Sequence, residues 1–238
     1  MNREYHKWYA HDLGRDMELL VFGHAGTPVM VFPTSLGSYF EYEDRGMIGC
    51  LADRIDAGML QFYCVSSVDR ESWYNKQAHP YWRVRHYMQY EKYLLGDVLP
   101  LIRLKNPTPR LAVTGCSFGA YHAMNFALRH PDIVTDVITM GGAFDIKQFL
   151  DGWYGEDAYF NNPPDFLPNL SDHYVLEQMR RMNIILVTGE HDQCWQDNER
   201  LAAIFRNKCI PHQLIVWGDR TGHDWPWWQK MARVYFAA

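Results

Sequence analysis

The segment RLAVTGCSFGAYHAMNFALRH, residues 110–130, joins a short apolar run to a helix-forming run through a serine between two glycines. The run 110–115 has the length and composition of a buried strand, and the run 120–130 has helical spacing and ends before Pro131. A sharp turn between them would expose the Ser117 hydroxyl at a helix N-terminus, which favours developing negative charge. Side chains in place of the glycines would collide with neighbouring backbone. The pattern predicts that Ser117 is a nucleophile; the alternative interpretation is a plain glycine turn.

The rest of the chain alternates between apolar strand-like runs and helical runs. The expected strands are 17–23, 29–34, 60–69, 110–115, 136–142, 183–189 and 212–218, and the expected helices are 46–58, 82–105, 120–130, 198–209 and 227–236. This alternation indicates a mostly parallel sheet with helices on both faces, so we predict one α/β domain over residues 1–238. The turn residues HAGTP (24–28) predict a hairpin between the first two strands.

Composition excludes several classes of protein. The chain of 238 residues is 47% hydrophobic and carries a net charge of −5 without a basic run, which argues against nucleic acid or an anionic membrane as the main partner. The N-terminal residues 1–16 are polar and lack the apolar core of a signal peptide, so a cytoplasmic location is the simplest prediction. The five cysteines are irregularly spaced and predict neither a disulfide framework nor a zinc site.

Ligand sites of such sheets lie at the carboxyl ends of the strands, so the candidate base and acid are expected among the residues that follow each strand. His223 follows the last expected strand and is the predicted base, whereas His122 lies within a helix and is expected to be a core histidine. Asp192 follows the strand 183–189 and is the predicted carboxylate, with Glu190 and Asp197 as alternatives. The chain order is then serine, aspartate, histidine.

Two backbone N–H groups are expected to bind an oxyanion. One is the N–H of Phe118, directly after the serine, and the other is the N–H of Ser35 in the loop 34–44, with Leu36 as the next choice; the alternative is an ordinary capping loop. Cys116 is expected to be a buried, unreactive thiol. The run HDQC (191–194) has no second cluster at ligand spacing, so no metal is expected.

These motifs resemble those of the putative-esterase group of α/β hydrolases, which includes esterase D-like, feruloyl esterase-like and mycolyltransferase-like members. The resemblance covers nearly the whole chain and is strongest at the serine turn followed by residues 123–132. It implies an α/β-hydrolase fold, serine hydrolase chemistry on acyl esters without a cofactor, and a catalytic triad of Ser117, Asp192 and His223. The chain departs from the group where PTS (33–35) replaces a His-Gly or Asp-Gly pair and where Ala120 replaces a common second glycine.

Aromatic residues gather in segments expected to be loops, which suggests a lined pocket. The predicted substrate-binding residues are Leu36, Tyr39, Trp73, Trp153, Trp195 and Trp225. The segment 143–170 is rich in Gly, Pro, Asn and aromatics with little helical periodicity, and we expect a small cap over the site. For both features, the alternative is aromatic packing on the body of the protein.

The sequence therefore predicts a serine esterase that cleaves a small-molecule acyl ester through an acyl-enzyme. The alternatives are an acyltransferase or thioesterase that uses the same three residues, and a catalytically silent binding protein of the same fold. A nucleotide-binding protein is excluded because the chain has neither a G-x-G-x-x-G motif nor a P-loop motif.

Overall fold

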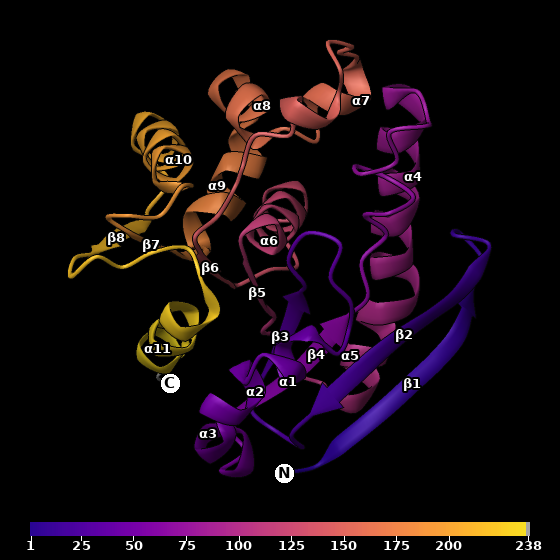
Figure 1. The fold of residues 1–238 in the computed structure, drawn as a ribbon, viewed down its shortest axis with the longest axis vertical. Helices are drawn as coiled ribbons and strands as arrows, with labels where there is room; N and C mark the ends of the chain where they lie inside the picture. Colours follow the sequence, from indigo (N-terminus) through magenta and orange to yellow (C-terminus); the bar gives the residue numbers. More distant parts are fainter. Residues whose placement is uncertain (237–238) are drawn as a thin grey trace.

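The computed structural model describes residues 1–236 and has one central sheet with helices on both faces (Figure 1). Within these residues the sheet has eight strands: β1 Arg3–Ala10, β2 Arg15–Phe22, β3 Thr27–Phe32, β4 Leu60–Val65, β5 Ala112–Cys116, β6 Asp136–Met140, β7 Asn183–Gly189 and β8 Gln213–Trp217. Their order across the sheet is β1-β2-β4-β3-β5-β6-β7-β8. Strand β2 runs antiparallel to both neighbours, and the pairs from β4 to β8 are parallel, so the predicted mostly parallel sheet is confirmed.

The predicted hairpin between residues 17–23 and 29–34 is wrong. Strand β4 lies between β2 and β3, and β3 runs parallel to β4. All six residues of β4 are buried, so this strand takes a central place with a neighbour on each side. The actual hairpin joins β1 to β2. Strand β1 was missed because its burial alternates between exposed and half-buried residues, which leaves a polar sequence typical of an edge strand.

The helices form two groups, one on each face of the sheet. Their bounds are α1 Glu41–Asp44, α2 Met47–Cys50, α3 Ala52–Asp56, α4 Pro80–Tyr93, α5 Leu99–Lys105, α6 Phe118–Arg129, α7 Glu156–Tyr159, α8 Pro163–Asn169, α9 His173–Arg181, α10 Trp195–Asn207 and α11 Trp225–Tyr235. A π-helical turn at Leu94–Val98 joins α4 to α5, and a 3₁₀ turn lies at Lys147–Phe149. One apolar cluster takes residues from α4 to α10, and the other takes residues from α1, α2, α3 and α11.

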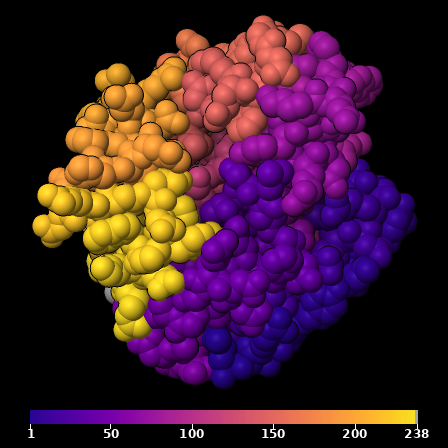
Figure 2. All heavy atoms as spheres, in the orientation of Figure 1, coloured from indigo at the N-terminus to yellow at the C-terminus, as the bar shows by residue number. Residues whose placement is uncertain are grey.

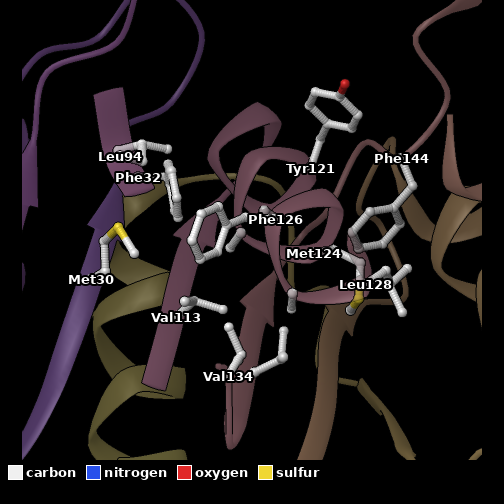
Figure 3. Packing of buried hydrophobic residues seen from close by; sticks show 14 of the residues in the cluster. Met30, Phe32, Leu94, Val113, Tyr121, Met124, Phe126, Leu128, Val134 and Phe144 are labelled. Carbon is white, nitrogen blue, oxygen red and sulfur yellow. The ribbon is translucent and has the colours of Figure 1, made fainter. Parts of the chain in front are cut away.

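Alternate residues of the strands supply the two clusters. In β3, Met30 and Phe32 belong to the cluster beneath α6, while Val29 and Val31 belong to the cluster on the opposite face. Figure 3 shows the first cluster, with Phe126 of α6 packed near Phe32. Burial on both faces explains why the strands are continuous apolar runs in the sequence.

Three helical segments differ from the prediction. The helix expected over 46–58 breaks at Leu51, whose φ of −112° is not helical, into α2 and α3. Helix α9 was not predicted; its N-cap residue is Asp172, whose side chain accepts a hydrogen bond from the Val175 N–H. The segment 143–170, in which the sequence shows little helical periodicity, contains the 3₁₀ turn, α7 and α8.

The parallel strands bring six chemically informative residues to one edge of the sheet. They follow β3, β4, β5, β6, β7 and β8 and are Ser35, Asp69, Ser117, Gly141, Asp192 and His223. Figure 2 shows that early, middle and late parts of the chain border one another on one face of the molecule. Among residues 1–236, no helix has the length and apolar character that crossing a membrane requires.

Candidate active site

Ser117 occupies a strained turn between β5 and α6. Its φ of 54° and ψ of −122° lie in a region that non-glycine residues rarely adopt. A Cβ atom on Gly115 would lie 2.2 Å from backbone atoms of Gly119. A Cβ atom on Gly119 would lie 2.5 Å from the carbonyl oxygens of Phe32 and Pro33. Both glycines therefore allow backbone segments to approach closely enough for the turn to form.

The side chains of Ser117, His223 and Asp192 form a continuous hydrogen-bonded chain. His223 Nε2 lies 2.9 Å from Ser117 Oγ, although the two residues are 106 positions apart in the sequence. His223 Nδ1 lies 2.8 Å from Asp192 Oδ1. Since a carboxylate only accepts hydrogen bonds, Nδ1 carries the proton and Nε2 is free to accept the serine proton.

The other two candidate carboxylates are occupied elsewhere. Glu190 is exposed, and its Oε1 accepts a hydrogen bond from the Arg220 N–H. Asp197 Oδ2 accepts from the Phe144 N–H at 3.2 Å. Of the three carboxylates considered from the sequence, Asp192 is the one that contacts His223.

Asp192 is enclosed by close neighbours. Its side chain is fully buried, and its Oδ1 also accepts a 2.7 Å hydrogen bond from the Cys194 N–H. Gly141 has a φ of +57°, and a Cβ atom there would lie 2.5 Å from Asp192 Oδ2 and 3.0 Å from His223 Nδ1. The Trp228 ring packs edge-on against His223 at 4.9 Å. Sequence reasoning missed Gly141 and Trp228. The two consecutive glycines that follow β6, at positions 141 and 142, could have indicated that the backbone approaches the site closely there.

The predicted oxyanion loop lies next to the serine turn. Tyr74 Oη donates a 2.7 Å hydrogen bond to Ser35 Oγ, and the Tyr74 ring contacts the Phe118 ring at a centroid distance of 6.0 Å. Within residues 1–236, the N–H groups of Ser35 and Phe118 have no hydrogen-bond partner. They are available to an oxygen atom of a ligand.

Two carboxylates hold the loop on either side of Ser35. Glu41 accepts hydrogen bonds from the N–H and the hydroxyl of Thr34, both at 2.7 Å. Asp69 Oδ2 accepts from the Leu36 N–H at 2.9 Å. Burial raises the pKa of Glu41, and the hydrogen bonds from Thr34 oppose this rise. Asp69 was not identified from the sequence, although it is the last residue of the predicted strand 60–69.

The predicted substrate-binding aromatics take different positions. Trp73 is fully buried among Tyr87, Tyr121 and Phe149, so its assignment to a pocket is corrected to core packing. The adjacent Tyr74 instead contacts Ser35 of the predicted oxyanion loop.

The other predicted substrate-binding residues stay predictions, and the structure gives their neighbours. Tyr39 packs against Tyr5 of β1, Trp153 against His79, and Trp225 against Trp228. Trp195 begins α10, and its indole N–H is buried without a partner among the described residues. Leu36 is 40% exposed.

A cleft of about 620 Å³ opens beside the predicted oxyanion loop. Its lining includes Leu36, Gly37, Phe40, Arg45 and Arg70, so apolar and charged groups share it. Ser117 does not line this cleft. We therefore regard the hydrogen-bonded chain of Ser117, His223 and Asp192, and not this cleft, as the centre of the candidate site.

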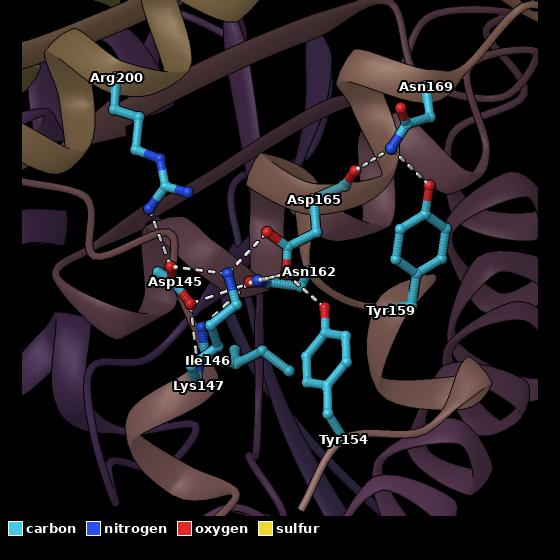
Figure 4. Close-up of polar contacts among 9 residues, drawn as sticks. All are labelled: Asp145, Ile146, Lys147, Tyr154, Tyr159, Asn162, Asp165, Asn169 and Arg200. Atoms are coloured by element: carbon cyan, nitrogen blue, oxygen red, sulfur yellow. Dashed lines mark hydrogen bonds and ion pairs between the residues drawn. The ribbon is translucent and has the colours of Figure 1, made fainter. Parts of the chain in front are cut away.

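The segment 143–170 is organised by its own polar contacts (Figure 4). The buried Asn162 donates to Asp145 and Asp165 and accepts from the Ile146 N–H. The segment also reaches the serine turn, because the Phe149 ring contacts the Phe118 ring at 4.9 Å.

The predicted unreactive thiol of Cys116 lies in the core. Cys116 is fully buried and shares a hydrogen bond with the Tyr42 hydroxyl, and burial raises the pKa of its thiol.

Asp192, Cys194 and His223 offer potential metal-ligand atoms within 4.8 Å of one another. Burial raises the pKa of the Cys194 thiol to about 12, which opposes formation of the thiolate that binds metals.

Comparison with known proteins identifies the family and the fold. A family model described as "Putative esterase" matches residues 44–232, and a search of curated protein sequences finds no match. A solved ferulic acid esterase superposes with a TM-score of 0.80 at 16% identity, over 99% of this chain and 96% of that chain. An S-formylglutathione hydrolase from Agrobacterium tumefaciens gives 0.76 at 14% identity, over 98% and 92%. One from Staphylococcus aureus gives 0.72 at 14% identity, over 99% and 95%. The predicted α/β-hydrolase fold is confirmed.

Proposed function

The chain belongs to the putative esterase family, and from this premise we propose that it hydrolyses carboxylic esters through Ser117, His223 and Asp192. The observation that carries the proposal is the hydrogen-bonded chain from Ser117 Oγ through both nitrogens of His223 to Asp192. It supplies a nucleophile, a base within proton-transfer distance and a carboxylate that sets the tautomer of the base.

The first half of the proposed reaction forms an acyl-enzyme. His223 Nε2 takes the proton from Ser117 Oγ as this oxygen attacks the ester carbonyl carbon. The electron pair of the carbonyl double bond moves onto its oxygen, which accepts hydrogen bonds from the N–H groups of Ser35 and Phe118. The tetrahedral intermediate then collapses, His223 returns the proton to the leaving oxygen, and the alcohol departs. Asp192 stabilises the transient imidazolium.

The second half releases the acid. His223 takes a proton from water, and the resulting hydroxide attacks the acyl carbonyl. Collapse of the second intermediate restores the Ser117 hydroxyl with the proton from His223. The proposed steps use neither a cofactor nor a metal ion, and the partner is a small-molecule ester.

The names of the structural neighbours guide the choice of substrates. One neighbour is described as a ferulic acid esterase and two as S-formylglutathione hydrolases. We therefore propose a panel that contains oxygen esters of aromatic and short-chain acids together with thioesters. Added alcohols and thiols would reveal transfer in place of hydrolysis, because they would consume the acyl-enzyme and yield new esters.

The test is covalent labelling by a fluorophosphonate, followed by intact-mass measurement. We expect a single adduct on the native protein, no adduct on Ser117→Ala and slow labelling of His223→Ala. The exposed Ser171 offers a matched control, because Ser171→Ala should label at the native rate. A folded native protein that neither labels nor hydrolyses any ester of the panel would refute the proposal.

A further inference from the structure

We propose that Asp69, supported by His122, is a positioning residue that holds the oxyanion loop for catalysis. The inference rests on the proposed esterase function and adds two residues that the reaction steps above do not use. It begins from a buried hydrogen bond between a carboxylate and an imidazole, which requires an explanation.

Asp69 and His122 form a pair in the interior. Their side chains are 0% and 1% exposed, and His122 Nε2 lies 3.0 Å from Asp69 Oδ1. Burial of a carboxylate is unfavourable unless its oxygens receive hydrogen bonds. Because a carboxylate only accepts, His122 donates from Nε2.

The second oxygen of Asp69 points to the oxyanion loop. Asp69 Oδ2 accepts the Leu36 N–H at 2.9 Å. Leu36 has a φ of 60°, a left-handed conformation that a residue with a branched side chain adopts only when its surroundings impose it. The hydrogen bond from Leu36 to a buried, anchored carboxylate supplies that constraint.

The position of Ser35 follows from the two anchors that flank it. Thr34 is bound to Glu41 and Leu36 is bound to Asp69, so the backbone is held before and after Ser35. The Ser35 N–H itself has no partner among residues 1–236. A donor that is held in place and unoccupied is what oxyanion stabilisation requires, since reorganisation during the reaction is then avoided.

His122 ties this loop to the nucleophile. It belongs to α6, the helix that begins directly after Ser117, and α6 also packs against β3, which precedes the loop (Figure 1). The His122 ring contacts the Phe118 ring at 4.7 Å. The Asp69–His122 pair thus joins the helix that presents the serine to the loop that presents the second N–H group.

The experiment compares truncations with conservative replacements in the full-length protein. Asp69→Ala should lower kcat about 10²-fold, as expected for loss of one oxyanion donor, with KM within about threefold of native. Asp69→Asn should retain most activity because its amide oxygen can still accept the Leu36 N–H. In the same way, His122→Gln retains a donor for Asp69 and should be far more active than His122→Leu.

An oxyanion mimic distinguishes positioning from general loss of structure. An aryl trifluoromethyl ketone forms a hemiketal oxyanion with the serine, so its inhibition constant should weaken in parallel with kcat/KM across the four variants. The pH profile of kcat/KM should stay native, because His223 and Asp192 are unchanged. Ser72→Ala is the control: Ser72 is fully buried in the same segment, and its hydroxyl donates to the Val68 carbonyl at 2.8 Å, so this variant should lose thermal stability and keep its activity.

The outcomes separate the two proposals. Native-like kcat and ketone affinity in Asp69→Ala, with Ser117→Ala inactive, would overturn this inference and leave the esterase function standing. If Asp69→Ala does not fold, equal activities of His122→Gln and His122→Leu would overturn it instead. A native protein without esterase activity would overturn both.

Discussion

Gly141 separates the backbone after β6 from the histidine–aspartate pair, and Gly141→Ala should inactivate the protein with little loss of fold. The added Cβ would lie 2.5 Å from Asp192 Oδ2, 3.0 Å from His223 Nδ1 and 3.1 Å from Trp228 Nε1. Carbon–oxygen contacts shorter than about 3 Å are repulsive, so the carboxylate must retreat by about half an ångström or more. Asp192 is buried, and its movement would disturb the 2.8 Å hydrogen bond to His223.

The magnitude follows from this displacement. A misplacement of about 1 Å can cost about 10²-fold in rate, and a histidine in the wrong tautomer costs about 10⁴-fold. We therefore expect kcat to fall by about 10²- to 10³-fold with KM nearly unchanged. The left-handed φ of Gly141, +57°, adds about 1–2 kcal/mol of strain when a Cβ is present.

The assay measures kcat and KM on an activated ester, the rate of fluorophosphonate labelling and the thermal midpoint. Gly14→Ala is the matched control, because Gly14 has a φ of +65° but its added Cβ would meet nothing closer than Tyr9 Oη at 3.9 Å. This control should show the strain without the loss of activity. A Gly141→Ala protein with kcat within about threefold of native would refute the reasoning.

Two other predictions concern acid stability and thiol reactivity. Although burial raises the pKa of Glu91, hydrogen bonds from His130 and Arg129 outweigh it and lower the pKa from 4.5 to about 2. The lowered pKa of Glu91 corresponds to up to about 3 kcal/mol of stability against unfolding. This contribution is complete above pH 4.5 and should disappear as the pH falls toward 2. Stability should therefore fall less steeply with decreasing pH in Glu91→Gln than in the exposed-site control Glu199→Gln, as measured by acid unfolding followed by circular dichroism. Coincident unfolding curves for the two variants would contradict the lowered pKa of Glu91. Cys116 is buried with a raised thiol pKa, so a disulfide reagent should leave it unmodified in the active, folded protein; peptide mapping that finds Cys116 modified at native activity would show that it is not enclosed.

Local sequence alone determined most of the sheet and the turn at Ser117. Five of the parallel strands are continuous apolar runs because both faces of the sheet are covered, and this pattern is visible without any knowledge of neighbours. Gly115 is a local requirement as well, since a Cβ atom there would meet backbone atoms of Gly119 in the same turn, whereas Gly119 avoids the carbonyl oxygens of Phe32 and Pro33, which are distant in the chain. The choice of Ser117, Asp192 and His223 followed from their positions after strands, and their catalytic roles stay predictions.

Strand order was beyond local reasoning. Whether β2 pairs with β3 or with β4 depends on which strand has a neighbouring strand on each side. The position of a strand within a sheet is a property of the assembled sheet. The edge strand β1 was missed for the same reason: a polar, alternating run becomes a strand because β2 offers it a partner.

The tertiary structure alone decided which side chains meet. It selected Asp192 over Glu190 and Asp197 by contact with His223, and it moved Trp73 from a pocket into the core. It also revealed Gly141 and the Asp69–His122 pair, whose significance depends on atoms that are distant in the chain. Spacing along a sequence specifies which element carries a residue, whereas hydrogen bonds and van der Waals contacts between elements arise only when the chain has packed.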